Sequence, residues 1–205
     1  MINKRILSIV LLLALSISVA TAEERRHHQF HLSDISTLEL NVRAGTILVE
    51  HSDSDYIDIV VLITEEDKNW LGRSVDLSAM DIEVSNVDSA LQLNFDYKGV
   101  STDWIIKVPE LRKIEINAGA GTVDINMVRA DLNANIGVGT IDLRLSKAAF
   151  GDMELASGVG DTSVSGAISA ESRRAFVSSD VRARGTGDLT LRANVGVGSV
   201  DAALL

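Results

Sequence analysis

A short glycine motif recurs along the second half of this chain and constrains its fold more than any other feature. Residues 117–125 (NAGAGTVDI) return as residues 135–143 (NIGVGTIDL) and again as residues 194–202 (NVGVGSVDA). Residues 157–164 form a weaker copy, and a degenerate copy is expected near residues 177–179. A repeat of about 19 residues is the length of one structural unit, too short to form a domain alone.

Alignment of the copies on their glycines separates apolar columns from polar ones. Apolar residues alternate with polar residues on both sides of each Gly-x-Gly, which is the period of a half-buried β-strand. Glycine at the turn between the two strands supplies backbone conformations that a Cβ would block. The apolar columns hold Ile114, Leu132, Met153 and Leu191; Ile116, Ala134, Leu155 and Ala193; Val123, Ile141, Thr162, Val181 and Val200; and Ile125, Leu143, Val164, Ala183 and Ala202.

Such a unit cannot bury its apolar face alone, but copies stacked about 4.8 Å apart would share a continuous core. The pattern therefore predicts an all-β fold in which residues 109–205 form a right-handed parallel β-helix, or solenoid, of about five coils. A series of hairpins is the competing architecture, because Gly-x-Gly also reverses chains. Asn117 and Asn135 repeat two places before the first glycine, as expected for an asparagine ladder between coils, which favours the solenoid.

Residues 23–108 form the second predicted unit, an N-terminal β portion that caps the solenoid. Segments 37–42, 46–50, 56–63, 81–84, 91–95 and 104–108 alternate with period two and are rich in β-branched residues. Both tryptophans, Trp70 and Trp104, lie in this half, and we expect them to pack in the core because large aromatic side chains contribute most by burial.

Three segments carry a family resemblance. Residues 104–109 (WIIKVP), 113–116 (KIEI) and 121–125 (GTVDI) resemble the β-helical "putative adhesin" family of bacterial domains of unknown function. Gly45-Thr46-Ile47 resembles the first glycine turn of that family, and the resemblance covers roughly residues 30–205. It implies a β-helical fold and a role in surface attachment. It implies no catalytic residues, because that family has none established.

The first 22 residues are typical of a secretory signal peptide. Lys4 and Arg5 precede an apolar run that is too short to span a bilayer, and Ala20-Thr21-Ala22 is a small-residue cleavage site. An uncleaved N-terminal anchor is the alternative. The absence of cysteine suits an oxidising compartment. We therefore expect an exported protein, periplasmic or at the cell surface, with no membrane span after cleavage.

The composition excludes several kinds of chemistry. Acidic residues outnumber basic ones 29 to 19, so bulk charge does not favour nucleic acid. The Gly-x-Gly turns lack the third glycine of a dinucleotide fingerprint and the lysine of a P-loop. We predict no catalytic, cofactor-binding or metal-binding residues and a non-catalytic binding or scaffold role in the cell envelope. The alternative is a carbohydrate-active β-helix enzyme, which would need a cleft walled by long loops.

Two features leave a metal site as a weaker alternative. Neighbouring carboxylates in one column would repel each other, and calcium or an arginine such as Arg144 would relieve that repulsion. We expect a solvated charge ladder instead. The column that forms this ladder holds Asp124, Asp142, Ser163, Arg182 and Asp201.

The second feature is a group of histidines near the N-terminus: His27, His28 and His31. Three histidines so close in sequence could bind a transition metal, but we expect a loose polar tail there.

The C-terminal end supplies the only expected partner surface. The chain stops inside the repeat at residues 200–205, with no helix, proline or lysine run to cover a strand edge. An open last coil would expose unpaired backbone groups. We therefore expect this edge to be covered by a second copy or by an envelope partner, although a short charged edge that tolerates water is an alternative. The identity of the partner is not encoded in any motif.

Overall fold

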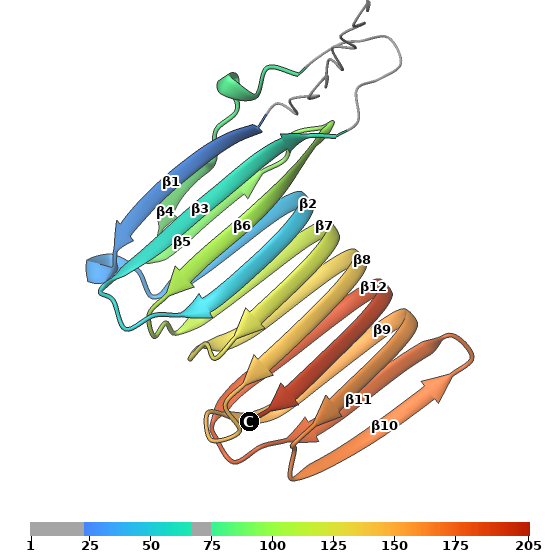
Figure 1. Cartoon of the computed structure of the whole chain (residues 1–205). Coiled ribbons are helices and arrows are strands. Elements are labelled where there is room, and N and C mark those ends of the chain that lie inside the picture. Colours follow the sequence, from blue (N-terminus) through green and yellow to red (C-terminus); the bar gives the residue numbers. More distant parts are fainter. Residues whose placement is uncertain (1–22, 67–74) are drawn as a thin grey trace, which may run out of the picture.

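Long strands that bend at a glycine corner and stack side by side form the body of the molecule (Figure 1). A computed structural model describes residues 23–66 and 75–205. This part of the chain is all-β, with one largely parallel 12-stranded sheet and two short 3-10 turns. The elements are β1 (Glu23–His31), η1 (Leu32–Asp34), β2 (Thr37–His51), β3 (Tyr56–Glu65), η2 (Leu77–Ala79), β4 (Glu83–Val87), β5 (Ala90–Phe95), β6 (Val100–Val108), β7 (Lys113–Asn126), β8 (Asp131–Leu145), β9 (Phe150–Ser165), β10 (Ser169–Ala175), β11 (Ser178–Arg184) and β12 (Leu189–Leu204).

The sheet has a parallel centre and antiparallel ends. Its order is β1-β3-β6-β2-β7-β8-β12-β9-β11-β10, with β5 also beside β2 and β4 beside β5. Strands β6, β2, β7, β8, β12 and β9 are paired in parallel. Strands β1 and β3 are antiparallel at one end, and β11 and β10 are antiparallel at the other.

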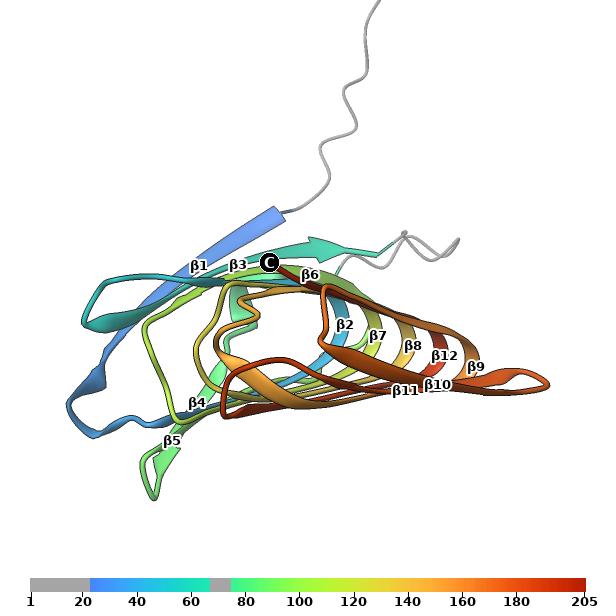
Figure 2. The same ribbon diagram turned by 90° about the horizontal axis from the view of Figure 1, so that it is seen from below.

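The two halves of the bent strand β2 belong to two opposite walls around the core. Its first half pairs with β5 and its second half pairs with β6, while both halves pair with β7 on the other side. The view in Figure 2 shows the two halves of the long strands on opposite sides of the enclosed space. Leu40 from the first half and Ile47 from the second half are both fully buried. The alternation of the sequence therefore places apolar side chains from both walls in one core.

The glycine corners are required for two separate reasons. Gly45, Gly121, Gly139, Gly160 and Gly198 have φ between 131° and 146°, a region that residues with a Cβ rarely adopt. In addition, a Cβ on Gly139 would lie 1.8 Å from the carbonyl oxygen of Gly121 on the neighbouring strand. The expectation that glycine at these turns supplies backbone freedom is confirmed.

The order of the stack differs from the order of the repeats in the sequence. Strand β12 lies between β8 and β9, in parallel register with both. A simple solenoid, in which each coil follows the preceding one along the chain, is therefore not observed. The register is nevertheless the predicted one, since Gly121, Gly139, Gly198 and Gly160 align across β7, β8, β12 and β9.

The degenerate fifth copy is not a parallel coil. Strand β11, which begins at Ser178, pairs antiparallel with β9 and with β10. Val181 and Ala183 are buried as predicted, but they face Leu155 and Met153 in an antiparallel ladder. Alignment of this copy with the others would place Arg174 in an otherwise apolar column, and in the structure Arg174 belongs to the exposed strand β10. The expectation of about five parallel coils in residues 109–205 is wrong for this copy.

The C-terminal strand is not an edge. Because β12 is paired on both sides, residues 200–204 have no free backbone edge, and the reason for expecting a partner at this end does not hold. The N-terminal portion is also more closely joined to the repeats than a separate cap, since β2 carries the same corner and stacks directly on β7. Trp104 is buried as expected, whereas Trp70 and the expected signal peptide lie outside the described residues.

The described ranges hold no helix that is long and apolar enough to cross a bilayer.

Candidate binding surface

A ladder of asparagine side chains runs across the stack just before the glycine corner. Asn117 donates its side-chain amide to Asn41 at 3.0 Å, and Asn135 donates to Asn117 at 3.0 Å. Asn194 donates to Asn135 at 3.0 Å, and Asn41 donates to Asn94 at 2.8 Å. The ladder predicted from Asn117 and Asn135 is confirmed and extends over β5, β2, β7, β8 and β12. It ends at β9, where Ala156 replaces the asparagine.

The sequence contained a signal for one of the additional rungs but not for the other. Asn41 lies two places before Arg43, which occupies the first-glycine position of the Gly45 turn, so alignment of that turn with the repeats would have found it. Asn94 has no glycine turn beside it. Only the pairing of β5 with β2 brings Asn94 opposite Asn41.

An open groove of about 880 Å³ lies along this ladder. Its walls come from the end of β5 and from the corners of β2, β7 and β8, so it crosses several strands. Arg43 and Asp96 form an ion pair across 3.3 Å at this groove, and both side chains are largely exposed. The remaining lining is uncharged: Asn41, Val42, Ala44, Asn94, Phe95, Asn117, Ala118, Gly119, Ala120, Asn135, Ile136 and Gly137.

The groove offers repeated amide chemistry on a fixed spacing. A side-chain amide has two N–H donors and two acceptor lone pairs, and the ladder uses one donor and one acceptor at each inner rung. Asn135 also donates its amide to Asn133 at 3.3 Å, and Asn117 also hydrogen-bonds the Glu115 carboxylate, so the group that remains for a ligand at these rungs is the second lone pair of the amide oxygen. Because the rungs lie on adjacent strands, this acceptor repeats about every 4.8 Å. The arrangement can hold an extended, uncharged polymer by hydrogen bonds.

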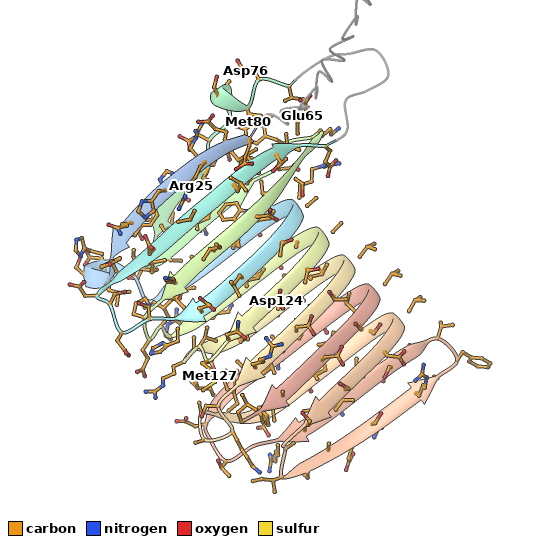
Figure 3. The ribbon with its side chains drawn as sticks, in the orientation of Figure 1. Arg25, Glu65, Asp76, Met80, Asp124 and Met127 are labelled. Atoms are coloured by element: carbon orange, nitrogen blue, oxygen red, sulfur yellow. The ribbon has the colours of Figure 1, made fainter. Side chains whose placement is uncertain are left out.

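A row of carboxylates follows the corner on the other half of the strands. Asp124, Asp142 and Asp201 align on β7, β8 and β12, and Ser163 on β9 continues the row. Figure 3 marks Asp124 on the face turned toward the viewer. The predicted column is therefore correct for these four residues. It is wrong for Arg182, which lies on β11 opposite Glu154, and 3.4 Å separates that guanidinium from the Glu154 carboxylate.

Asp142 is the central carboxylate of this row. Burial of the carboxyl group, and then the like charges of Asp124 and Asp201, raise the pKa of Asp142, and Arg144 opposes the rise. Ser163 donates its hydroxyl to Asp201 at the end of the row. Within residues 23–66 and 75–205, no group of three or more histidine or acidic side chains has the geometry to hold a metal ion.

The histidines near the N-terminus do not form a loose tail. Strand β1 contains His27, His28 and His31 and pairs antiparallel with β3 along its whole length, so the expectation of a mobile segment is wrong. The His27 Nε2 atom lies 2.6 Å from a carboxylate oxygen of Asp58, and this contact lowers the pKa of Asp58. His28 points to the opposite face of the strand, where it stacks on Phe30. Alternation along the strand therefore places His28 on the face opposite to that of His27 and His31.

Solved structures named as a putative cell adhesion protein or as putative adhesins match this chain with low similarity. A "putative cell adhesion protein" from Clostridium sporogenes matches with a TM-score of 0.49 and 13% identity, over 90% of this chain and 100% of that chain. A "putative adhesin" from Bacteroides fragilis matches with a TM-score of 0.28 and 12% identity, over 87% of this chain and 97% of that chain. One from Parabacteroides merdae has a TM-score of 0.25 and 15% identity, over 62% and 54%.

The names of the Bacteroides and Parabacteroides structures contain the term used for the family that the sequence resembles. No protein-family model and no curated protein matches the chain. The names of the matched structures describe those proteins alone.

Proposed function

We propose that the protein is an exported, non-catalytic module of the cell envelope or cell surface that binds a partner in an adhesin-like way. We further infer that its stacked strands form a right-handed parallel β-helix with a β cap made by the N-terminal portion. The groove along the asparagine ladder is the binding surface of this proposal. The single observation that supports it best is the continuity of the ladder with an open groove of about 880 Å³.

The ligand class follows from the groove chemistry. The floor carries amide groups and small apolar side chains, and the charges of Arg43 and Asp96 neutralise each other. A neutral, hydroxyl-rich polymer, such as an envelope or host glycan, can donate its hydroxyl groups to the remaining lone pair of the amide oxygen at each inner rung. A strongly charged polymer would find no counter-charge on the floor.

Rigidity is the second property that supports binding at this surface. Each inner rung is hydrogen-bonded to its neighbours, and the backbones of adjacent corners are in close contact, so the spacing of the amides is fixed before a ligand arrives. A preorganised surface loses little conformational entropy on binding. This property favours a binding scaffold over a site that closes around a substrate.

The test is a binding assay with a panel of neutral and charged polysaccharides. Asn117→Ala removes a central rung, and we expect it to weaken binding of a neutral glycan at least about tenfold, the effect of losing one to two hydrogen bonds. Asn126→Ala is the matched control, because Asn126 lies on the same strand outside the groove. Far-UV circular dichroism and thermal melting check that both variants are folded.

The outcomes separate the candidates. Binding that is lost in Asn117→Ala and kept in Asn126→Ala supports the proposal. No binding to any polymer overturns the ligand class. Release of shortened products from a bound polymer contradicts a non-catalytic role and supports the carbohydrate-active enzyme instead.

A further inference from the structure

Strand β10 forms one end of the stack and has a free edge. Among residues 23–66 and 75–205 it pairs with β11 on one side only, and all its side chains are exposed. The turn that follows carries Phe176, whose side chain is completely exposed at a φ of 51°. Ile168, just before the strand, is 61% exposed. An edge strand flanked by exposed apolar side chains is a template for pairing with another chain.

The sequence of β10 is complementary to itself in one register. Two copies related by a two-fold axis perpendicular to the sheet pair antiparallel, and residues that face each other must point to the same side of the sheet. With the axis at Ser172, Glu171 of one copy lies opposite Arg173 of the second copy, and Arg173 lies opposite Glu171. Both contacts join opposite charges.

The neighbouring registers bring like charges together. Because opposite residues must point to the same side of the sheet, the two-fold axis can lie only at a residue and not between two residues. An axis at Glu171 would place the two Glu171 carboxylates opposite each other, and an axis at Arg173 would place the two guanidinium groups opposite each other. Like charges directly opposite are destabilising, so the register centred on Ser172 is favoured over both.

The same register continues a row of alternating charge that already exists within one copy. Glu171 lies opposite Arg182 of β11, and Arg182 lies opposite Glu154 of β9. The Arg192 guanidinium lies 3.5 Å from a carboxylate oxygen of Glu154. On the next row, Arg173 stands opposite Asp180. Pairing at Ser172 joins the two rows across the interface, so the sequence of charges alternates without interruption from Arg192 of one copy to Asp180 of the second.

The apolar residues at the two ends of β10 agree with this register. Phe176 of one copy falls opposite Ile168 of the second copy, because both are four residues from the axis. Each is exposed in the single chain, and the two-fold symmetry would form this apolar contact twice in the pair. Arg174 is already paired with Asp161 at 2.6 Å and falls opposite the small Ala170, so it needs no new partner.

We propose that the free edge of β10 is a self-association surface, at which a second copy of this chain adds its own β10 antiparallel about a two-fold axis at Ser172. The occupant is a second copy because the charges of β10 complement one another in this register. This surface replaces the C-terminal edge expected from the sequence, and it is independent of the groove and of its ligand.

The first test exchanges charges. Analytical ultracentrifugation over a range of concentrations should show a dimer for the native chain. Arg173→Glu alone places carboxylates opposite each other at both contacts, and we expect monomer. Glu171→Arg alone places guanidinium groups opposite each other at both contacts and should also give monomer. A mixture of the two single variants brings opposite charges together at both contacts and should form a dimer, while each chain keeps the in-chain change already present in its own monomeric control. Lys98→Glu is the charge-matched control, because Lys98 is exposed and belongs to a loop of the N-terminal portion.

The second test uses the absence of cysteine in the chain. Residues directly opposite in an antiparallel pair have Cα atoms about 4.5–5.5 Å apart, within the range of a disulfide. Ser172→Cys should therefore form a covalent dimer on mild oxidation. Ser169→Cys, on the same strand, should not, because the two copies of residue 169 lie about 20 Å apart.

The results decide the proposal together. A native chain that stays monomeric at every concentration overturns it. So does a mixture of Glu171→Arg and Arg173→Glu chains that stays monomeric, or equal crosslinking at residues 169 and 172, since either result contradicts this register.

Discussion

A Cβ on Gly139 would lie 1.8 Å from the carbonyl oxygen of Gly121, on a strand that pairs with it in parallel register. The contact repeats down the stack: a Cβ on Gly121 would lie 1.8 Å from the oxygen of Gly45, and one on Gly198 would lie 1.7 Å from the oxygen of Gly139. The hydrogen-bonded ladder between the strands therefore brings the corners closer together than a residue with a side chain permits.

Gly139→Ala is expected to be strongly destabilising for this reason. The positive φ costs about 1 kcal/mol, and the overlap with Gly121 adds about 1–3 kcal/mol through forced backbone movement. Gly99→Ala is the matched control: its φ is 77°, but the nearest atom to its Cβ would be a Val75 methyl at 3.8 Å. Chemical denaturation of both variants measures the difference. Equal losses would contradict the importance of the close contact.

Removal of an inner rung of the asparagine ladder should cost more than removal of the last rung. Asn135→Ala leaves the Asn117 carbonyl oxygen and the Asn194 amide without their partners, whereas Asn194→Ala frees only the Asn135 oxygen. We expect a loss of about 1–3 kcal/mol for Asn135 and less for Asn194, because unpaired half-buried polar groups are costly. Urea unfolding compares them, and a larger effect at Asn194 would contradict the ladder as a stabilising element.

Asp142→Asn should increase stability at neutral pH. Burial and the charges of Asp124 and Asp201 raise the pKa of Asp142 in the folded chain, so its ionisation opposes folding. The native chain is penalised once the pH rises through this folded pKa, and it is relieved below the ordinary aspartate pKa of about 3.9. The gain from Asn should therefore be present near pH 7 and absent near pH 3. A gain that is the same at both pH values would exclude this electrostatic cause.

Asp58→Asn should have the opposite sign. The hydrogen bond from His27 lowers the pKa of Asp58, so the ionised carboxylate stabilises the fold above its ordinary pKa. That contribution is lost as the pH falls through the lowered pKa. Asp58→Asn is therefore expected to destabilise at neutral pH, with a difference from the native chain that shrinks in acid. Thermal melting over a pH series measures it, and unchanged stability at neutral pH would contradict the pairing.

Export should be visible in the mass of the purified protein. Cleavage after Ala22 would produce a periplasmic or surface chain that begins at Glu23, which is also the first residue of β1. Intact mass spectrometry after cell fractionation measures this directly. A membrane-bound species that keeps Lys4 and Arg5 would support the uncleaved anchor instead.

Local features of the repeat determine much of the fold. The alternation around each Gly-x-Gly decides which side chains enter the core, as Ile141 and Leu132 show by their burial. The glycines decide where each strand bends, because only they tolerate the positive φ. Asn117 and Asn135 decide one edge of the groove. Each of these properties depends on residues within one copy, so each could be predicted from the sequence.

The order of the copies was decided only in three dimensions. All parallel copies share one register, so the backbone ladder of β12 fits any of them equally well. Side chains outside the shared columns make contacts that are specific to this order. Thr190 donates its backbone N–H and its hydroxyl to Asp131, the first residue of β8, and Ser157 of β9 donates to the Gly198 carbonyl oxygen. These contacts join residues far apart in the chain.

The groove and the free edge depend on the same long-range choices. Asn94 joins the ladder only because β5 pairs with β2, and β10 becomes the edge only because β12 returns to the middle of the sheet. The periodicity of a chain specifies what each strand presents to its neighbours. Which neighbour it meets depends on the free energy of the whole assembly, since alternative pairings of similar repeats differ by only a few specific contacts.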